Sequence, residues 1–342
     1  MKQAVVTGVR QGGVIEVPEP APRGNWVKVK VLAAPMCTEV KGFVHGDGSH
    51  GYGHEAAGEV VAIAQPCRVK PGDRVVVQPG TPCGSCDLCV AGDFIHCERW
   101  IDHESFTGGR SGLATMAQYI LKPDWLLSPI PDGMSYDLAS LAVCGLGPTF
   151  EAFERMRVDA FDTVLITGLG AVGLGGVVNA VFRGARVIGV EANDYRAELA
   201  RTLGAETVLD PADPDLLPRI RALTRGRGVP KAVDCSGMVK AHTLCLDAAS
   251  RLGHMAFVGQ CWEPTPLPVS QHMIRKGLTL HGIWHYNLSA YPRLLQVIER
   301  SPVVGRMITH TFPLAQVQQA WETQVSGRCG KVILHPWDSS LG

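Results

Sequence analysis

The chain has 342 residues, which fits two domains, and 46% of its residues are hydrophobic, enough to bury large cores. Its 32 lysines and arginines balance 32 aspartates and glutamates, and this formal net charge of zero argues against the basic faces of nucleic-acid-binding and membrane-surface proteins. Because no apolar run approaches the roughly 20 residues of a membrane span, and the N-terminus lacks a signal-peptide core, we predict a cytoplasmic protein with reduced cysteines.

Residues 1–130 are predicted to form short β-strands. The valine-rich segments WVKVKVLAA, GEVVAIA and DRVVVQPG are bounded by glycine, proline and aspartate turns, and long helical periodicity is absent. The first part of the chain is therefore expected to be a β-rich domain.

A loop within this β-rich part carries a cluster of cysteines. The segment CGSCDLCVAGDFIHC has the spacing C-x2-C-x2-C-x7-C, formed by Cys83, Cys86, Cys89 and Cys97. Four thiolates on one short loop suit a closed tetrahedral zinc site, which folds the loop and performs no catalysis. An iron–sulfur cluster also uses four cysteines, but nothing else in the sequence indicates electron transfer, so zinc is favoured.

The pattern changes near residue 148, where strand-like and helix-like segments begin to alternate. DTVLITGLGAVGLGGVVNAVFRGARVIGVEAN has the pattern of a buried strand, a glycine turn, a helix and a second buried strand. Further strands are expected near 206–209, 232–235, 254–258 and 278–283, with helices between them. Six apolar strands with helical crossovers predict a parallel, doubly wound sheet.

The glycine turn has the spacing of a dinucleotide-binding loop. Gly168, Gly170 and Gly173 form G-x-G-x-x-G directly after a strand and at the start of a helix. The first glycine permits a tight turn, the second lets the backbone approach a pyrophosphate, and the third allows close helix–strand contact. With Ala171 and Val172, they open a helix whose N-terminal N–H groups attract phosphates.

Glu191 ends the second strand of this unit, eighteen residues after Gly173. A carboxylate there accepts hydrogen bonds from both hydroxyls of an adenosine ribose and repels a 2′-phosphate. No arginine follows directly, since the next residues are Ala192 and Asn193. We therefore predict NAD rather than NADP as the cofactor. The alternative, a glycine-rich turn that binds nothing, is disfavoured because strand, helix and acidic residue occur together.

The chain ends in a further set of elements. After HGIWHYN the sequence predicts a helix (YPRLLQVIER), a strand (MITHTF), a second helix (LAQVQQAWETQ) and a final strand (KVILHP).

Together these features resemble the zinc-dependent medium-chain alcohol and polyol dehydrogenases over nearly the whole chain. The resemblance is carried by GHEAAGEV (53–60), VKPGDRVVV (69–77), the cysteine lobe (83–97), VCGLGPTFEAF (143–153), GLGAVG (168–173) and VDCSG (233–237).

The resemblance implies an α/β fold with two domains. A GroES-like β-rich catalytic domain is expected at 1–147, with the structural zinc lobe at 83–97. A Rossmann NAD-binding domain with a doubly wound parallel sheet is expected at 148–284, and residues 285–342 are expected to return to the catalytic domain. The family also implies a homodimer or homotetramer.

The resemblance further implies a second, catalytic zinc, so two zinc ions and one NAD are expected per chain. The matching ligands here are Cys37, His54 and Cys144, with Glu55 at times in the fourth position. Three protein ligands leave one position open, which a catalytic zinc requires. In the family this zinc activates an alcohol for hydride transfer to NAD, and Thr38 matches the residue that hydrogen-bonds the substrate oxygen and relays its proton.

The loop at the first ligand departs from the family pattern, which is cysteine, any residue, serine or threonine, and then an acid. This chain has Met36-Cys37-Thr38-Glu39. If Thr38 and Glu39 set the register, Met36 takes the ligand position, and a thioether is a poor zinc ligand. If the loop has lost one residue, Cys37 remains the ligand. We favour Cys37, because the other ligands have little reason to converge without a third; core packing is its alternative role.

Other residues match the family in part. Lys41 stands where a second relay histidine is common, and His45 and His50 are alternatives to be weighed against ordinary loop histidines. The resemblance also places Ile283 and Trp284 near the nicotinamide.

We therefore expect a zinc- and NAD-dependent dehydrogenase that oxidises a secondary alcohol to a ketone, with no nucleic-acid or membrane partner. The short, glycine-rich segment between Cys37 and His54 favours a polyol, sugar or cyclitol over a small alcohol. Two alternatives stay open. One is a zinc-independent reductase on the same scaffold, favoured if Met36 holds the ligand position, and the other is a non-catalytic NAD-binding protein with only the structural zinc.

Overall fold

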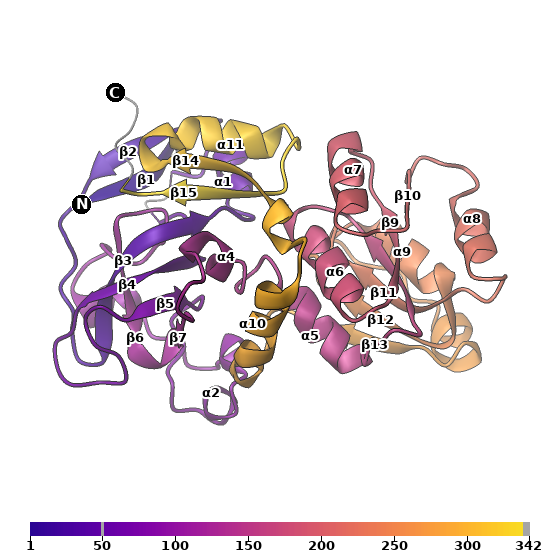
Figure 1. Ribbon diagram of the computed structural model, residues 1–342, viewed down its shortest axis with the longest axis horizontal. Helices are drawn as coiled ribbons and strands as arrows, with labels where there is room; N and C mark the ends of the chain where they lie inside the picture. Colours follow the sequence, from indigo (N-terminus) through magenta and orange to yellow (C-terminus); the bar gives the residue numbers. More distant parts are fainter. Residues whose placement is uncertain (49–50, 338–342) are drawn as a thin grey trace. The chain divides into compact units, whose positions relative to one another are not determined.

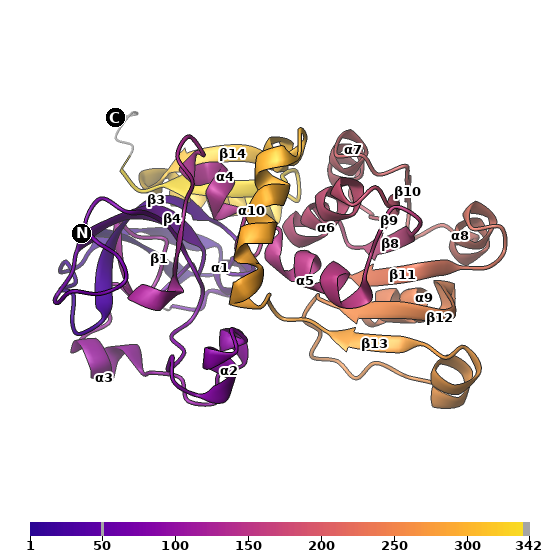
Figure 2. The same ribbon diagram turned by 60° about the horizontal axis from the view of Figure 1, so that its bottom comes forward.

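The computed structural model describes residues 1–48 and 51–337. The chain forms two compact units, whose ribbons are shown in Figures 1 and 2. Unit 1 consists of Met1–Cys144, Asn287–Glu299 and Ile308–Gly342, and unit 2 of Gly145–Tyr286 and Arg300–Met307. Most of the C-terminal segment thus belongs with the β-rich start of the chain.

Unit 1 is built on a mainly antiparallel sheet with the strand order β14-β15-β3-β4-β5-β7, to which β6 is added through β3. These strands are β3 (Trp26–Pro35), β4 (Ala56–Ala62), β5 (Arg74–Val77), β6 (Tyr119–Pro123), β7 (Leu127–Pro129), β14 (Ile308–Pro313) and β15 (Lys331–His335). A separate hairpin pairs β1 (Lys2–Gly8) with β2 (Gln11–Glu16). The valine-rich segments predicted as strands lie in β3, β4 and β5, and their alternate side chains fill the core.

Helices surround this sheet, and two of them close one side of its core. The α-helices of this unit are α1 (Val40–His45), α2 (Asp87–Val90), α3 (His103–Thr107), α4 (Tyr136–Ser140), α10 (Tyr291–Arg300) and α11 (Val317–Val325). Phe43 on α1 stacks on Trp321 of α11, with ring centroids 5.0 Å apart, and both rings are wholly buried. The C-terminal helix is therefore part of the same hydrophobic core as the N-terminal strands.

Unit 2 contains a six-stranded parallel sheet in the order β10-β9-β8-β11-β12-β13. The strands are β8 (Thr163–Thr167), β9 (Arg186–Val190), β10 (Thr207–Leu209), β11 (Val229–Asp234), β12 (Ala249–Phe257) and β13 (Thr279–Gly282). Its helices are α5 (Gly147–Met156), α6 (Ala171–Phe182), α7 (Asp194–Thr202), α8 (Leu216–Leu223) and α9 (Val239–Ala248). The chain reverses direction across the sheet between β8 and β11, so the predicted doubly wound Rossmann topology is confirmed.

The sheet of unit 1 brings together three segments that are far apart in the sequence. Strand β15 pairs antiparallel with β3 at Ile333 and Pro35, and β3 pairs antiparallel with β4 at Ala33 and Ala57. Antiparallel neighbours place the end of one strand beside the start of the next. The residues after β3, those before β4 and the first residue of β15 therefore lie at one end of this sheet.

Among the described residues, the structure contains no helix with the length and apolar character needed to cross a membrane.

Candidate metal and cofactor sites

Four predicted site residues of unit 1 meet at that end of the sheet. Cys37 follows β3, His54 and Glu55 precede β4, and Cys144 follows α4; each offers a ligand atom, and these atoms all lie within 4.8 Å of one another. The Nε2 atom of His54 is 3.1 Å from Sγ of Cys144 and 3.9 Å from Oε1 of Glu55. Two thiols, an imidazole and a carboxylate are donors that zinc accepts, so this set fits a zinc ion.

Met36 occupies a different place. Its side chain is wholly buried in the hydrophobic core of unit 1, and its backbone N–H donates to the carbonyl oxygen of Val332 over 2.9 Å. Of the two candidates for the ligand position, Cys37 is the one whose sulfur joins the cluster. This arrangement favours the interpretation that the loop has lost one residue, and it removes core packing as the main role of Cys37.

Glu39 belongs to the site, although the sequence analysis assigned it no role. Its Oε1 atom contacts Nδ1 of His54, and its Oε2 atom accepts a hydrogen bond of 3.0 Å from the backbone N–H of Cys37. A carboxylate on one ring nitrogen fixes the orientation of a metal-binding histidine, and here it turns Nε2 towards the cysteines. The available signal was an acidic residue two positions after a candidate ligand.

Lys331, the first residue of β15, was also missed. Its Nζ atom lies 2.6 Å from Oε1 of Glu55, and both side chains are wholly buried. The other carboxylate oxygen of Glu55 accepts a hydrogen bond of 3.2 Å from the backbone N–H of Cys144. Lysine is almost never fully buried unless it is paired. The lone lysine at the start of the apolar segment KVILHP was the only signal in the sequence.

The four side chains and Lys331 strongly perturb one another's pKa values. A hydrogen bond from the Cys144 thiol lowers the pKa of Cys37 well below its ordinary value, while the pKa of Cys144 rises. Burial raises the pKa of Glu55 to about 8 against the opposing charge of Lys331. Burial alone would lower the pKa of Lys331, but the charges of Glu55 and the two thiolates raise it. Such mutual perturbation is typical of functional sites.

Burial also acts to lower the pKa of His54, but the charge of Glu39 and the contacts with Cys37 raise it well above its ordinary value.

The predicted proton-relay residues follow Cys37 closely in the chain. Thr38 has an exposed side chain, and Lys41 and His45 are exposed on α1. His50 lies outside the described residues. The relay role of Thr38 remains a prediction.

The cysteine lobe forms a second cluster in unit 1. The sulfurs of Cys83, Cys86, Cys89 and Cys97 all lie within 4.8 Å of one another. Backbone N–H groups point at them: those of Cys83 and Arg99 donate to Cys97 Sγ, and that of Cys86 donates to Cys83 Sγ, each over 3.3 Å. Four convergent sulfurs that also receive backbone N–H groups fit a tetrahedral zinc.

Replacing Cys89 with serine is expected to weaken this structural zinc site and lower thermal stability, because metal binding free energy holds the loop folded. Zinc content and melting temperature of the purified variant test this. Val90→Thr is a suitable control, because Val90 is an adjacent exposed residue. If Cys89→Ser kept both its zinc content and its melting temperature, the lobe would not be a metal site.

The glycine loop of unit 2 has the geometry that a pyrophosphate requires. Gly168 has φ +79°, and a Cβ atom there would lie 2.6 Å from Cβ of Ser236. A Cβ on Gly173 would lie 2.0 Å from the carbonyl oxygen of Gly168, whereas one on Gly170 would meet nothing within 4 Å. The first and third glycines therefore close the turn against its neighbours, and the second leaves open space above the backbone.

Helix α6 begins directly after this turn. Its first residues, Ala171 and Val172, are only partly buried, so the N-terminal N–H groups of the helix are accessible. The positive end of the helix is suited to bind phosphate.

Glu191 lies directly after β9, against the glycine loop. Its Oε2 atom accepts a hydrogen bond of 2.6 Å from the backbone N–H of Leu169, and its Oε1 atom accepts one of 2.9 Å from Asn193. Each carboxylate oxygen keeps a further lone pair, with which it can accept a ribose hydroxyl.

Ile283 and Trp284 follow β13 at the same edge of the parallel sheet, where the carboxyl ends of the strands meet. The Ile283 side chain is buried, while that of Trp284 is half exposed. Their contact with a nicotinamide remains a prediction.

Known families and relatives match both units. The family model described as "Alcohol dehydrogenase GroES-like domain" matches residues 23–132, and the one described as "Zinc-binding dehydrogenase" matches residues 171–300. The zinc-type alcohol dehydrogenase-like protein YphC of Escherichia coli is 33% identical over 89% of this chain and 84% of its own length. Sorbitol dehydrogenase of Bacillus subtilis is 28% identical over 98% and 97%, and L-threonine 3-dehydrogenase of Symbiobacterium thermophilum is 30% identical over 94% and 93%.

Solved structures have the same fold. Alcohol dehydrogenase TADH from Thermus sp. ATN1 matches with a TM-score of 0.89 at 23% identity, covering 98% of this chain and 99% of that one. A zinc-dependent alcohol dehydrogenase from Streptococcus pneumonia matches with a TM-score of 0.83 at 26% identity over the full length of both chains. With its GroES-like and Rossmann units and these relatives, the chain belongs to the zinc-dependent medium-chain dehydrogenase/reductase family of oxidoreductases.

Proposed function

We propose that this oxidoreductase is a zinc- and NAD-dependent dehydrogenase that oxidises a secondary alcohol to a ketone. The observation that carries the proposal is the convergence of Cys37, His54, Glu55 and Cys144 within 4.8 Å. A structural zinc site is closed by four firmly bound ligands. Here three strong donors can hold the metal, while the fourth group, the carboxylate of Glu55, is paired with Lys331. This arrangement suits a zinc that keeps one position for substrate.

The residues in and around the cluster would have different roles in catalysis. A zinc ion held by Cys37, His54 and Cys144 would supply Lewis-acid polarisation of the alcohol oxygen. Glu39 orients the imidazole of His54. The two thiolates would balance a dication, and the Lys331 ammonium balances the carboxylate of Glu55. Buried charges are tolerated when they are balanced in this way.

A polar substrate with several hydroxyl groups suits this protein better than a small apolar alcohol. The segment between Cys37 and His54 is short and rich in glycine. Two relatives are named for sorbitol and L-threonine, which are both polar hydroxyl-bearing molecules. We therefore propose a polyol, sugar or cyclitol as the substrate class.

Glu191 is proposed to select NAD. Replacing Glu191 with serine and Ala192 with arginine is expected to raise kcat/KM for NADP relative to NAD by roughly tenfold or more, because a repelling charge is removed and a phosphate-binding one is added. Steady-state kinetics with both cofactors measure the ratio, and Ala192→Gln alone is the control. Equal use of the two cofactors by the wild-type protein would contradict the assignment.

Metal content and a substrate panel test the proposal as a whole. The purified protein is expected to contain two zinc ions per chain and to reduce NAD with at least one polyol, sugar or cyclitol, followed by NADH absorbance. One zinc per chain with reductase activity would favour the zinc-independent alternative, and one zinc with no turnover would favour a non-catalytic NAD-binding protein. Light scattering coupled to size exclusion would test the expected homodimer or homotetramer.

A further inference from the structure

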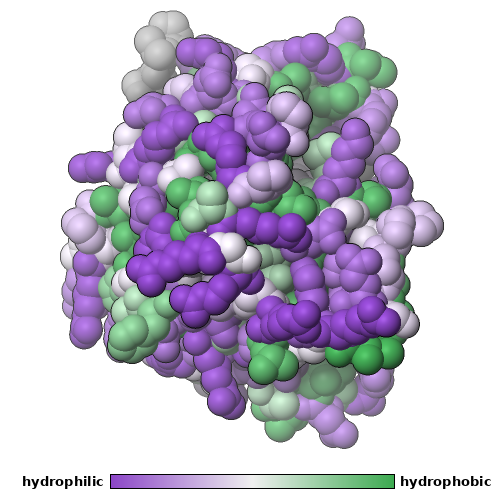
Figure 3. All heavy atoms as spheres, turned by 90° about the vertical axis from the view of Figure 1, so that its right-hand side faces the viewer, coloured by the Kyte–Doolittle hydropathy of each residue, from purple (hydrophilic) through white to green (hydrophobic). Residues whose placement is uncertain are grey.

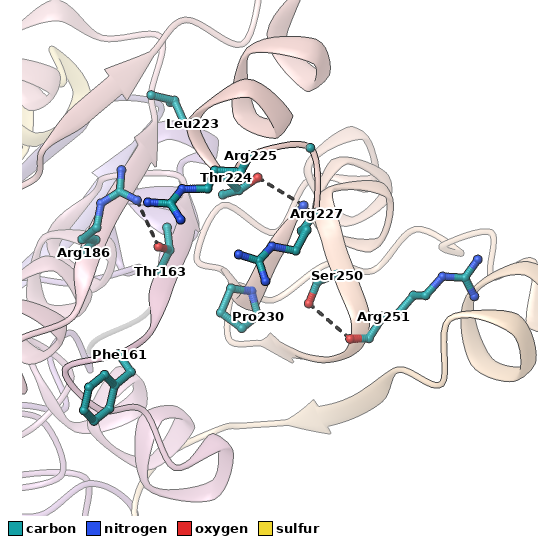
Figure 4. Close-up of a pocket in the computed structure, with 12 residues that line it drawn as sticks. Phe161, Thr163, Arg186, Leu223, Thr224, Arg225, Arg227, Pro230, Ser250 and Arg251 are labelled. Carbon is teal, nitrogen blue, oxygen red and sulfur yellow. Dashed lines mark hydrogen bonds between the residues drawn. The ribbon is translucent and has the colours of Figure 1, made fainter.

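Unit 2 has a pocket of about 770 Å³ at the edge of its sheet opposite the glycine loop (Figure 4). It is lined by Thr163 and Arg186, the first residues of β8 and β9, and by residues around the starts of β11 and β12. The glycine loop follows the other end of β8. Five residues of strand, at about 3.3 Å each, separate the two edges by roughly 16 Å, so this pocket is distinct from the expected cofactor site.

The lining carries four arginines and no aspartate or glutamate. Arg186 is paired with Glu206, and the guanidinium of Arg251 donates to the carbonyl oxygen of Arg275 over 2.8 Å. In Figure 4 the guanidinium groups of Arg225 and Arg227 point into the pocket, on the side of Thr163, whereas Arg251 extends away from it. Within residues 1–48 and 51–337, neither the Arg225 nor the Arg227 guanidinium forms a hydrogen bond or ion pair.

The loop that carries these two arginines has a defined shape. Thr224 Oγ1 accepts a hydrogen bond of 3.1 Å from the backbone N–H of Gly228 and donates one of 2.9 Å to the carbonyl oxygen of Ile220. Arg225 has φ +53°, a left-handed conformation that costs an L-residue about 1–2 kcal/mol. The backbone from which both arginines project is therefore turned and hydrogen-bonded, so a ligand would have to order their side chains but not the loop itself.

We propose that this pocket binds a small organic anion with two or more phosphate groups. Like charges that share a pocket repel one another, and a bound polyanion converts that repulsion into attraction. The planar guanidinium fork matches the oxygens of a phosphate and forms paired, charge-assisted hydrogen bonds with them. The volume lies in the ordinary range of small-molecule sites.

The surroundings favour a small organic molecule over a nucleic acid. Phe161 at the pocket is 97% exposed, and Leu223 and Pro230 add apolar surface that can contact the carbon skeleton of a ligand. Figure 3 looks at the side on which α8 lies and shows hydrophilic side chains over most of it, broken by hydrophobic patches. The chain as a whole is formally neutral, whereas nucleic-acid-binding domains are usually basic.

The test is calorimetric titration of the full-length, zinc-loaded protein with 2,3-bisphosphoglycerate at 0.15 M salt, with glycerate as the phosphate-free control. Saturable binding of the bisphosphate alone is expected. Arg225→Gln and Arg227→Gln should each weaken it about tenfold or more. Arg221→Gln is the matched control: this exposed arginine lies on the neighbouring helix α8 and does not line the pocket, so binding should change less than about twofold.

Absence of saturable binding up to millimolar bisphosphate would overturn the proposal. It would also be overturned if all three arginine variants weakened binding equally, since that would show only a general attraction to positive surface. Tighter binding of a DNA duplex, lost in Arg225→Gln and Arg227→Gln, would identify a macromolecular polyanion as the ligand instead. Thermal melts of the variants, which alter exposed side chains, are expected to match the wild type.

Discussion

Replacing Cys37 with alanine is expected to lower turnover roughly a thousandfold or more and to remove one of the two zinc ions per chain. The remaining His54 and Cys144 offer too few strong donors to hold zinc firmly. Loss of the metal removes the Lewis acid that activates the alcohol. Zinc content and kcat of the purified variant are the measurements. The affinity for NAD should change little, because the glycine loop and Glu191 belong to unit 2, whereas Cys37 belongs to unit 1.

Met36→Leu is the matched control for this prediction. Met36 is wholly buried in the core of unit 1, and a swap of similar volume usually costs less than about 1.5 kcal/mol. This variant should keep both zinc ions and nearly full activity. The opposite pattern, with Cys37→Ala active and fully metallated and Met36→Leu inactive, would place Met36 in the ligand position. Retention of zinc and activity in both variants would show that this loop does not supply the metal.

Replacing Lys331 with methionine is expected to destabilise unit 1 by about 3–5 kcal/mol when the catalytic zinc is absent. The lysine ammonium is 2.6 Å from the wholly buried carboxyl group of Glu55, so at a pH above the Glu55 pKa of about 8, where the loss is to be measured, its removal leaves an ionised carboxylate without a counter-charge. The Cys37→Ala protein is a suitable background, since it should lack only the catalytic zinc. Urea unfolding of the Cys37→Ala protein, with and without Lys331→Met, measures the cost.

Glu55→Gln provides the control for this ion pair. If charge imbalance causes the loss, adding Glu55→Gln to Lys331→Met should recover most of the stability, because an unpaired carboxylate is replaced by a neutral amide. The same cost with and without Glu55→Gln would mean that Lys331 contributes only packing, and its role in balancing the metal site would have to be abandoned.

The features that the sequence predicted well depend on residues close together in the chain. The strand, glycine turn and helix at Gly168 lie within one continuous segment, and the four lobe cysteines span fifteen residues. Local conformational rules and fixed ligand spacings therefore sufficed for the Rossmann topology, the glycine loop and the gathering of these four sulfurs. The resemblance supplied the pairing of His54 with Cys144, which no spacing rule predicts.

Only the tertiary structure decided which residue of the Met36-Cys37 pair enters the site, and only it revealed Glu39 and Lys331 as parts of that site. The reason is that strand register is non-local. Lys331 and Glu55 are 276 residues apart in the chain, yet they meet because β15, β3 and β4 are neighbours in one sheet. The pocket of unit 2 that is lined by four arginines also depends on non-local strand pairing. Parallel strands bring the residues at their amino ends, each from a different part of the sequence, to one edge of the sheet.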